Sequence, residues 1–463
     1  MSQGIISYGA YIPYYRLDRS TIRKTLGQGG GKGTRTVASH DEDSTSMGVE
    51  AARRARWGSA LPESLYFATT SPSYLDKTNA TTIHAALGAG HDGFAVDLGA
   101  SVRGAVGALR AAAATGGMAV LADVRSGRPG STDEALSGDG AAAFSFGSGD
   151  SVIAEIVSQA SATAEFLDRW RMPGDTFSRQ WEERFGTQVY LPLIQDVVTR
   201  ALKEAQLDSA THVIVSSPQA RAARTAVAAF AKESRADTLE AQVGFAGAAH
   251  AGLVLADVLD RAQPGDTILL VVAADGADAM VLRVTDAITR RPEVETVREQ
   301  LAVAGEVSYP DFLSWRGFLV KEPPRRPDPD RPAAPPSARA ERWKYAFEGS
   351  RCLECSTANV PPQRVCVKCS AVDRSEPIPL ADVQATVATF TIDRLAFSMA
   401  PPVVDVVIDF DGGGRYGCQL TDVDPGTVAI GDRVEMTFRR FYSTADGVHN
   451  YFWKARPARK GAK

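Results

Sequence analysis

Four of the five cysteines of the chain form two pairs of the type C-x2-C. The first pair is Cys352 and Cys355, and the second is Cys366 and Cys369. Four thiolates are the ligand set of a tetrahedral zinc ion with no position left open for water. A redox dithiol or an iron–sulfur cluster would need a C-x-x-C that opens a helix or a ferredoxin-like spacing, and the sequence has neither. The spacing therefore predicts a structural zinc ion that folds its segment.

A second group of residues with possible chemistry is Asp41, Glu42, Asp43 and Ser44, whose carboxylates could hold a metal ion. The segment that follows, SMGVEAARRA, is typical of a helix. Carboxylates and a hydroxyl group in front of a helix accept hydrogen bonds from its free amide groups and stabilise its positive end. The sequence therefore favours a helix N-terminus over a metal cluster here.

The elements that must position these residues follow from composition and periodicity. The chain has 463 residues, 44% hydrophobic and 23% charged, with a formal net charge of −4, which is typical of a globular protein without a general polyanion-binding surface. Up to about residue 290, apolar runs alternate with alanine-rich runs, which predicts a mainly parallel sheet covered by helices, built as two halves of a duplicated α/β fold. The expected strands are 5–7, 65–68, 95–98, 118–122, 142–146, 152–157, 212–215, 267–273 and 280–284, and the expected helices are 46–56, 81–87, 102–114, 193–205, 224–232 and 251–262.

The proline-rich segment 321–339, KEPPRRPDPDRPAAPPSAR, separates two parts of the chain. Its seven prolines disfavour helix and predict an extended linker. Beyond the cysteine pairs, short alternating segments at 384–392, 403–410, 415–420 and 433–438 are separated by glycine turns, which predicts a small barrel. We therefore divide the chain into an α/β domain (1–290), a connecting segment and linker (291–339), a zinc ribbon (340–378) and a barrel (379–457).

The opening segment MSQGIISYGAYIP has no basic region and no long apolar run, and no stretch of the chain is apolar enough to span a bilayer. Crowded cysteine pairs indicate metal binding rather than a secreted disulfide framework. We therefore expect a cytoplasmic protein that does not enter a membrane.

Several stretches of both parts of the chain resemble known families. FAVDLGASVRGAVGALRAAAATG at 94–116, LADVRSG at 121–127 and GDGAAAF at 138–144 resemble the nucleophile region of hydroxymethylglutaryl-CoA synthases and ketoacyl synthase III enzymes. The stretch 243–279 resembles their glycine loop and final strand pair, and 340–457 resembles zinc-ribbon/OB-fold proteins that accompany thiolases. The resemblance implies a duplicated thiolase-like α/β/α/β/α domain, followed by a rubredoxin-like zinc ribbon and an OB-fold β-barrel.

The positions that carry catalysis in that family are altered here. The family's nucleophilic cysteine corresponds to Ser101, its histidine to Ser216 and the asparagine of its glycine loop to Phe245, while its acid/base glutamate falls within TSPS at 70–73. A serine hydroxyl is a far weaker acid than a thiol and needs a nearby base. The joint loss predicts a pseudo-enzyme domain in which Ser101 caps its helix. His250 is the best remaining candidate base, and is equally well explained as a hydrogen-bonded residue at a helix start.

The resemblance implies a subunit of an acyl-CoA-handling complex. Such a subunit would form a homodimer through its thiolase-like domain, bind CoA or acyl-CoA, and place its zinc ribbon and barrel over the CoA tunnel of a separate thiolase-like catalytic subunit. The reaction of the assembly would be a Claisen or retro-Claisen acyl transfer. The alternative is an active acyltransferase or synthase that uses Ser101 as nucleophile and His250 as base.

A third class is nucleic-acid binding, because OB-fold barrels often bind single strands through aromatic side chains. The acidic turns DFDGGG and TDVDPG disfavour a phosphate track, and core packing explains the aromatic residues more simply. We therefore expect no nucleic-acid partner. The aromatic residues in question are Phe390, Phe397, Tyr442, Tyr451, Phe452 and Trp453.

Overall fold

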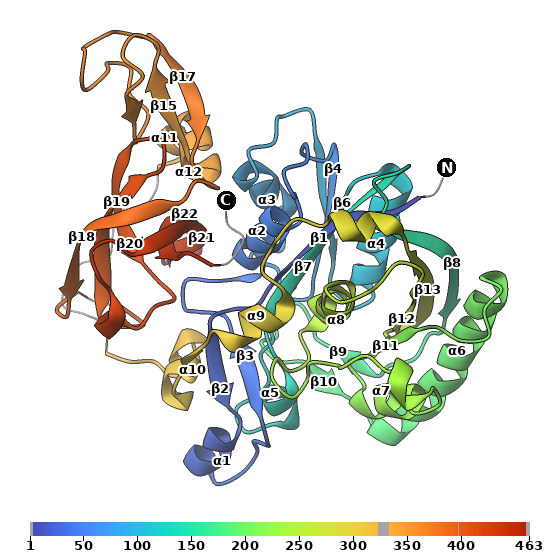
Figure 1. The fold of residues 1–463 in the computed structure, drawn as a ribbon. Coiled ribbons are helices and arrows are strands. Elements are labelled where there is room, and N and C mark those ends of the chain that lie inside the picture. The colour runs from blue at the N-terminus through green and yellow to red at the C-terminus, as the bar shows by residue number, and fades with distance from the viewer. Residues whose placement is uncertain (1–2, 323–332, 397, 460–463) are drawn as a thin grey trace.

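The computed structural model describes residues 3–322, 333–396 and 398–459. An α/β domain fills one side of the molecule, and a closed barrel and a small cysteine-bearing lobe lie on the other side (Figure 1). Within the described residues, no helix is long and apolar enough to cross a membrane.

A single nine-stranded sheet forms the centre of the α/β domain, in the order β11-β12-β13-β8-β1-β7-β6-β4-β5. The two halves of the sheet match on either side of the central strands β1 and β8. Strands β7, β6 and β4 follow β1 on one side, and their counterparts β13, β12 and β11 follow β8 on the other. This order confirms the duplicated α/β fold, and it leaves β5 without a counterpart. The strands are β1 (Gln3–Tyr11), β4 (Ser64–Thr69), β5 (Phe94–Gly99), β6 (Met118–Asp123), β7 (Gly140–Ser148), β8 (Ala154–Thr163), β11 (His212–Ser216), β12 (Thr267–Val272) and β13 (Gly276–Val284).

The expectation of a mainly parallel sheet is wrong. Strand β4 is parallel to β5 and β6, and β11 is parallel to β12, whereas all other pairs in this sheet are antiparallel. The short turn between β12 and β13 cannot cross over the sheet, so it reverses the chain and makes an antiparallel pair. Two small sheets, of β2 (Tyr15–Asp18), β3 (Thr34–Val37) and β14 (Gly305–Glu306), and of β9 (Arg169–Trp170) and β10 (Arg179–Gln180), lie outside the main sheet.

The expected helices are present, although some begin earlier than predicted. Helix α2 packs on β1, β6 and β7, α4 on β4 and β6, and α6 on β8 and β13. Asp43 caps α2 by accepting a hydrogen bond from the Ser46 amide, which confirms the predicted helix N-terminus. The helices of this domain and its connecting segment are α1 (Ser20–Leu26), α2 (Ser44–Arg54), α3 (Ala80–Ala86), α4 (Gly104–Thr115), α5 (Thr132–Leu136), α6 (Glu183–Glu204), α7 (Ala220–Val227), α8 (His250–Leu259), α9 (Val297–Ala302) and α10 (Tyr309–Trp315).

The proline-rich linker is helical at its end, contrary to expectation. Residues 323–332 lie outside the described residues, but α11 (Ala334–Arg339) covers the last part of the segment and α12 (Glu341–Ala346) follows it. Proline occupies the first turn of α11. Its missing amide is not needed there, and its fixed backbone angle suits a helix start.

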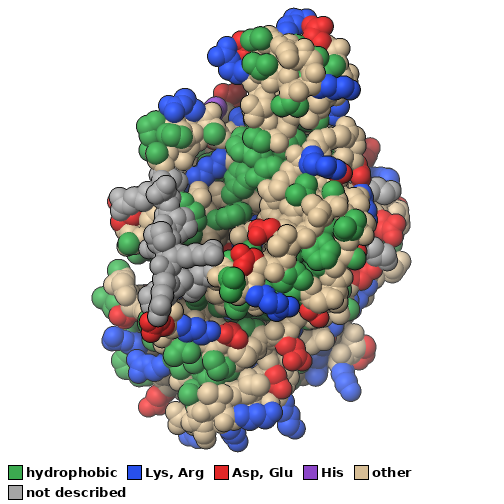
Figure 2. All heavy atoms as spheres, turned by 90° about the vertical axis from the view of Figure 1, so that its left-hand side faces the viewer, with side chains coloured by type: hydrophobic (Ala, Val, Ile, Leu, Met, Phe, Trp, Pro, Cys, Tyr) green, Lys and Arg blue, Asp and Glu red, His purple; other side chains and the backbone are tan. Residues whose placement is uncertain are grey.

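The four expected barrel strands are confirmed, and a fifth closes the barrel. The order is β18-β19-β20-β22-β21, and β22 pairs along the length of β21. The lobe before the barrel is a three-stranded sheet that projects at the top in Figure 2. The strands of the lobe are β15 (Glu348–Cys352), β16 (Ala358–Asn359) and β17 (Ser375–Pro379), and those of the barrel are β18 (Ala385–Asp393), β19 (Val403–Phe410), β20 (Arg415–Leu420), β21 (Arg433–Ser443) and β22 (His449–Pro457).

The barrel and the α/β domain share one apolar core. Met47 and Phe67 of the first domain belong to the same buried cluster as Phe347 and Trp453 of the second. At the same junction, the carboxylate of Glu50 in α2 forms a 2.7 Å ion pair with the guanidinium group of Arg456 in β22. The barrel is thereby fixed against α2. The domain limits given above stay a prediction.

Candidate functional site

The four cysteines of the lobe converge as the sequence predicts. Their Sγ atoms all lie within 4.8 Å of one another. Cys352 and Cys369 are 3.6 Å apart, as are Cys355 and Cys366. Two thiolates bound to one tetrahedral zinc ion at the usual bond length lie about 3.8 Å apart. The donor set and its geometry therefore fit a zinc ribbon with four protein ligands, which leaves a bound metal no open position for catalysis.

A pocket of about 630 Å³ lies where parallel strands of the sheet end. Its wall includes Thr70 after β4, Ser101 after β5, Arg125 after β6 and Pro218 after β11. Residues 168–175, which follow β8, supply a further wall. The carboxyl ends of strands in an α/β sheet are the usual place for a ligand. This is the cavity to which the sequence-predicted position Ser101 belongs.

The structure places Ser101 in this pocket but not as a helix cap. Helix α4 begins at Gly104, its N-cap is Arg103, and no side chain caps it. The residue before the serine, Ala100, has a positive φ of 82°. A non-glycine residue in this region is strained, and such strain occurs where a structure fixes the direction of a functional side chain. The predicted capping role of Ser101 is therefore wrong.

His250 does not line the pocket that contains Ser101. It is 3% exposed at the start of α8, its Nδ1 accepts a 3.3 Å hydrogen bond from the Ala246 amide, and its ring contacts that of Phe245. Burial lowers the pKa of His250 to about 4, so the ring is neutral at pH 7. Of its two predicted roles, the hydrogen-bonded residue at a helix start agrees with these contacts.

Ser216, at the position of the family's histidine, is also buried. It ends β11 with 2% of its surface exposed, and its hydroxyl has no partner among the described residues. The pocket wall contains Pro218 of the same loop but not Ser216. The three predicted positions Ser101, Ser216 and His250 therefore do not meet in one cavity.

Asp123 is a central residue of the site that sequence reasoning missed. Its carboxylate accepts hydrogen bonds from the Thr70 amide at 2.6 Å and the Ala248 amide at 2.7 Å, and from the hydroxyl groups of Thr69, Thr70 and Ser71. It thereby joins the TSPS segment to the glycine loop. The available signal was an aspartate that ends a buried apolar strand, where an unpaired charge is costly.

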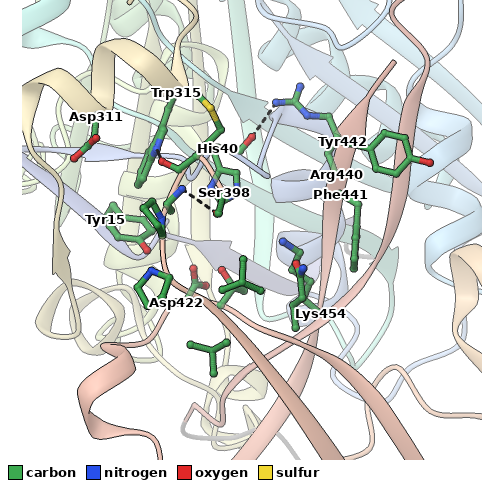
Figure 3. Close-up of a pocket in the computed structure, with 18 of the residues that line it drawn as sticks. Tyr15, His40, Asp311, Trp315, Ser398, Asp422, Arg440, Phe441, Tyr442 and Lys454 are labelled. Atoms are coloured by element: carbon green, nitrogen blue, oxygen red, sulfur yellow. Dashed lines mark hydrogen bonds between the residues drawn. The ribbon is translucent and has the colours of Figure 1, made fainter. Parts of the chain in front are cut away.

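A larger cavity, of about 1110 Å³, lies between the α/β domain and the barrel (Figure 3). His40 faces it from the α/β domain and Trp315 from the connecting segment, while Arg440 and Phe441 face it from β21. Arg440 donates to the carbonyl oxygen of His40 at 3.2 Å. Burial lowers the pKa of His40 to about 4, so its ring carries no charge at pH 7.

A buried ion cluster lies at the same junction. Arg439 of β21 is fully buried and contacts Asp41, Glu42 and Asp422, the first two at 3.3 Å and 3.0 Å. Lys454 of β22 contacts Asp41 at 2.8 Å. Asp41 and Glu42 thus pair with the barrel, a role that the local prediction of a helix N-terminus did not contain.

The barrel also reaches the mouth of the Ser101 pocket. Tyr74, which lines that pocket, accepts a 2.7 Å hydrogen bond from the His449 amide, and the two rings lie 4.7 Å apart. His449 begins β22. The second domain therefore contacts the pocket loop of its own chain.

Two of the aromatic residues considered for base stacking belong to the core of the barrel. Trp453 is fully buried and Tyr451 is 3% exposed. Phe390, Tyr442 and Phe452 are half-buried, and Phe397 lies outside the described residues.

Comparison with known proteins agrees with both parts of the structure. Residues 378–439 match a family model described as the C-terminal OB-fold domain of ChsH2. The hydroxymethylglutaryl-CoA synthase of Archaeoglobus fulgidus is 29% identical over 340 residues, which cover 68% of this chain and 98% of that protein. That of Methanopyrus kandleri is 29% identical over 342 residues, which cover 68% and 97%.

Solved structures show the same fold. A hydroxymethylglutaryl-CoA synthase complexed with CoA superposes with a TM-score of 0.58 at 17% identity, covering 67% of this chain and 89% of that one. The 3-oxoacyl-(acyl carrier protein) synthase III of Pseudomonas aeruginosa gives 0.55 at 19% identity, covering 62% and 98%.

The chain has a thiolase-like α/β fold, which it shares with a hydroxymethylglutaryl-CoA synthase and a 3-oxoacyl-(acyl carrier protein) synthase III. More particularly, the chain carries a hydroxymethylglutaryl-CoA synthase-like domain of the thiolase superfamily, followed by a four-cysteine cluster consistent with a zinc ribbon and by an OB-fold domain of the ChsH2 type.

Proposed function

We propose that this chain binds acyl-CoA in the Ser101 pocket and acts in a Claisen or retro-Claisen acyl transfer whose catalytic cysteine belongs to a separate thiolase-like subunit. One observation carries the proposal. Ser101 stands at the nucleophile position, and the pocket wall, as far as the described residues form it, contains no cysteine, histidine, lysine or glutamate. The pocket is present, but the usual groups for condensation are not.

The chemistry of the remaining groups supports a binding role. A serine hydroxyl needs a base to become a nucleophile, and His250 is neutral but lies outside the pocket wall. Asp168 lines the pocket, and burial raises the pKa of its carboxyl, but its side chain hydrogen-bonds with Tyr190. Neither His250 nor Asp168 is thus placed as a free base for Ser101.

The outer strand β5 supports a homodimer through the α/β domain. It pairs with β4 on one side and ends the sheet on the other. Phe94 at its start is 56% exposed, and the strand carries the apolar sequence FAVDLG. An unprotected apolar edge strand is a site for pairing with another strand. A second copy of the chain would cover it.

The contact between Tyr74 and His449 supports a role for the barrel at a CoA site. In this proposal, the barrel lies beside the Ser101 pocket of its own chain and also covers the CoA tunnel of the catalytic partner. CoA is the shared ligand of both positions. Zinc in the ribbon holds the lobe that precedes the barrel, and it takes no part in the reaction.

The test is native mass spectrometry of the chain and its co-purifying proteins from native cells, followed by incubation with acyl-CoA. We expect a thiolase-like protein at defined stoichiometry, retention of CoA esters, and no covalent acyl adduct on this chain. A partner-free dimer that gains acyl mass would overturn the proposal.

A second candidate is an active synthase or acyltransferase with Ser101 as acyl acceptor. It is favoured by the names of the curated relatives and by the strained Ala100 that precedes the serine. Ser101→Ala would then abolish acyl loading of the purified chain, whereas Ser178→Ala, which alters another serine of the same pocket, would retain it. Equal behaviour of the two variants would exclude this candidate.

A further inference from the structure

Two guanidinium groups converge on one residue of the Ser101 pocket. Arg125 Nη1 donates to Thr70 Oγ1 at 3.1 Å, and Arg171 Nη2 donates to the carbonyl oxygen of Thr70. Both arginines line the pocket. Arg125 is 8% exposed, whereas Arg171 is an exposed residue of the segment 168–175 that forms a further wall of the pocket. Two like charges are thus held beside the same residue, one deep in the wall and one nearer to solvent.

Among the described residues, no carboxylate forms an ion pair closer than 3.9 Å with either arginine, although Asp97, Asp168, Asp175 and Asp275 also line the pocket. Nε of Arg125 is buried without a partner, and its nearest carboxylate contact is Asp133 at 3.9 Å. Asp133 itself makes a bidentate pair with Arg169, at 2.9 Å and 2.7 Å. The carboxylate of Asp123 is already saturated by hydroxyl and amide donors.

The pKa of Arg125 reflects this shortage of close carboxylates. Burial lowers the pKa of Arg125 most, Arg169 and Arg171 lower it further, and Asp123 and Asp133 oppose this shift only in part. A buried guanidinium with spare donors is costly unless an anion accepts from it. The planar fork of arginine matches a carboxylate or a phosphate with two parallel hydrogen bonds.

We infer that the pocket accepts an acyl group that ends in a carboxylate, bound between Arg125 and Arg171. The shared chemistry is an oxyanion, which an acyl carboxylate or a phosphate group of CoA could supply. The carboxylate is favoured because the deep arginine belongs to the same cavity as Ser101, where the acyl end lies in the function proposed above. The inference rests on that function and adds the class of acyl group.

The experiment is titration calorimetry of the full chain with glutaryl-CoA, pentanoyl-CoA and CoA. The first two esters have acyl chains of equal length and differ in the terminal carboxylate. The variants are Arg125→Gln and Arg171→Gln, and the control is Arg128→Gln, an exposed arginine of the same loop that does not line this pocket. Arg171 lies at the surface, so its variant tests the inference even if Arg125→Gln does not fold.

We expect glutaryl-CoA to bind at least tenfold more tightly than pentanoyl-CoA. Each pocket variant should remove most of that preference, and the control should keep it. Equal binding of the two esters would overturn the inference and leave the proposed CoA function intact. Equal weakening of all three ligands in the pocket variants would assign the arginines to a CoA phosphate and also overturn it. Failure of every CoA compound to bind the wild-type chain would instead refute the proposed function itself.

Discussion

Two buried arginines of this molecule, Arg439 and Arg125, have different surroundings. At the domain junction, Arg439 is fully buried and contacts three carboxylates. In the Ser101 pocket, Arg125 is 8% exposed, and its hydrogen bond to a side chain goes to the hydroxyl of Thr70. A buried cation that the fold itself neutralises is part of the structure. One that the fold leaves under-neutralised beside a cavity is available to a ligand.

Removal of zinc from the predicted four-cysteine site should have the largest effect, and it should separate the cysteine lobe from the Ser101 pocket. Chelation of zinc should unfold the cysteine lobe, because structural zinc contributes about 10–16 kcal/mol in small zinc domains. The pocket belongs to the α/β domain and should still bind CoA esters. Hydrogen exchange of the lobe and ligand calorimetry measure the two properties in one sample.

The matched control is Cys418→Ser, since Cys418 lies in β20 outside the four-cysteine cluster. It should retain one zinc per chain, whereas Cys366→Ser should lose it. Retention of zinc by the second variant would contradict the assigned ligand set.

Arg439→Met should cause the next largest loss. It leaves the carboxylates of Asp41, Glu42 and Asp422 without their shared cation, which should lower the free energy of unfolding by about 3–5 kcal/mol. Arg415→Met, which removes an exposed ion pair with Asp409, should cost much less, because water and salt screen an exposed pair. Denaturant titration of both variants gives the comparison, and equal losses would refute a structural role of the buried cluster.

A pH titration of stability should show a smaller effect at the same junction. Burial raises the pKa of Glu42 to about 7 from its ordinary value of 4.5. The folded chain therefore keeps this proton in a range where the unfolded chain has released it, and stability falls as the pH rises from about 4.5 to about 7. Glu42→Gln should lose this slope in denaturant midpoints, while Asp382→Asn, at an exposed carboxylate of the same junction, should keep it. An unchanged slope in Glu42→Gln would show that Glu42 is ionised throughout.

Arg125→Gln should have the smallest effect on stability. The change removes a desolvated charge that has two other arginines nearby, so the free energy of unfolding should change by less than about 1 kcal/mol while ligand preference is lost. A loss as large as that of Arg439→Met would mean that the fold depends on Arg125, and the contrast between the two regions would disappear.

Local patterns predicted much of the fold. Periodicity located the strands and helices of both halves, and the spacing of Cys352, Cys355, Cys366 and Cys369 predicted their convergence. The fifth barrel strand, β22, was missed, although it pairs along the whole of β21. The expectation of a mainly parallel sheet was wrong because the connections between strands, rather than the strands themselves, set strand direction.

The candidate site was less predictable. The motif around Ser101 predicted its place at the nucleophile position. Its predicted capping role was wrong, because α4 begins at Gly104. Asp123 and Arg125 were part of a quoted motif, yet nothing local shows that one meets the glycine loop and the other meets Thr70.

The sequence alone determined the four-cysteine cluster, the two-part organisation and the serine at the nucleophile position, since each depends on residue types at short spacing. The tertiary structure decided the partners of the buried charges. Asp41 pairs with Lys454, more than four hundred residues away, while Arg125 meets a hydroxyl group in place of a carboxylate. The energy of a buried charge depends on what lies within a few ångströms of it, and that is set by packing between segments distant in the chain.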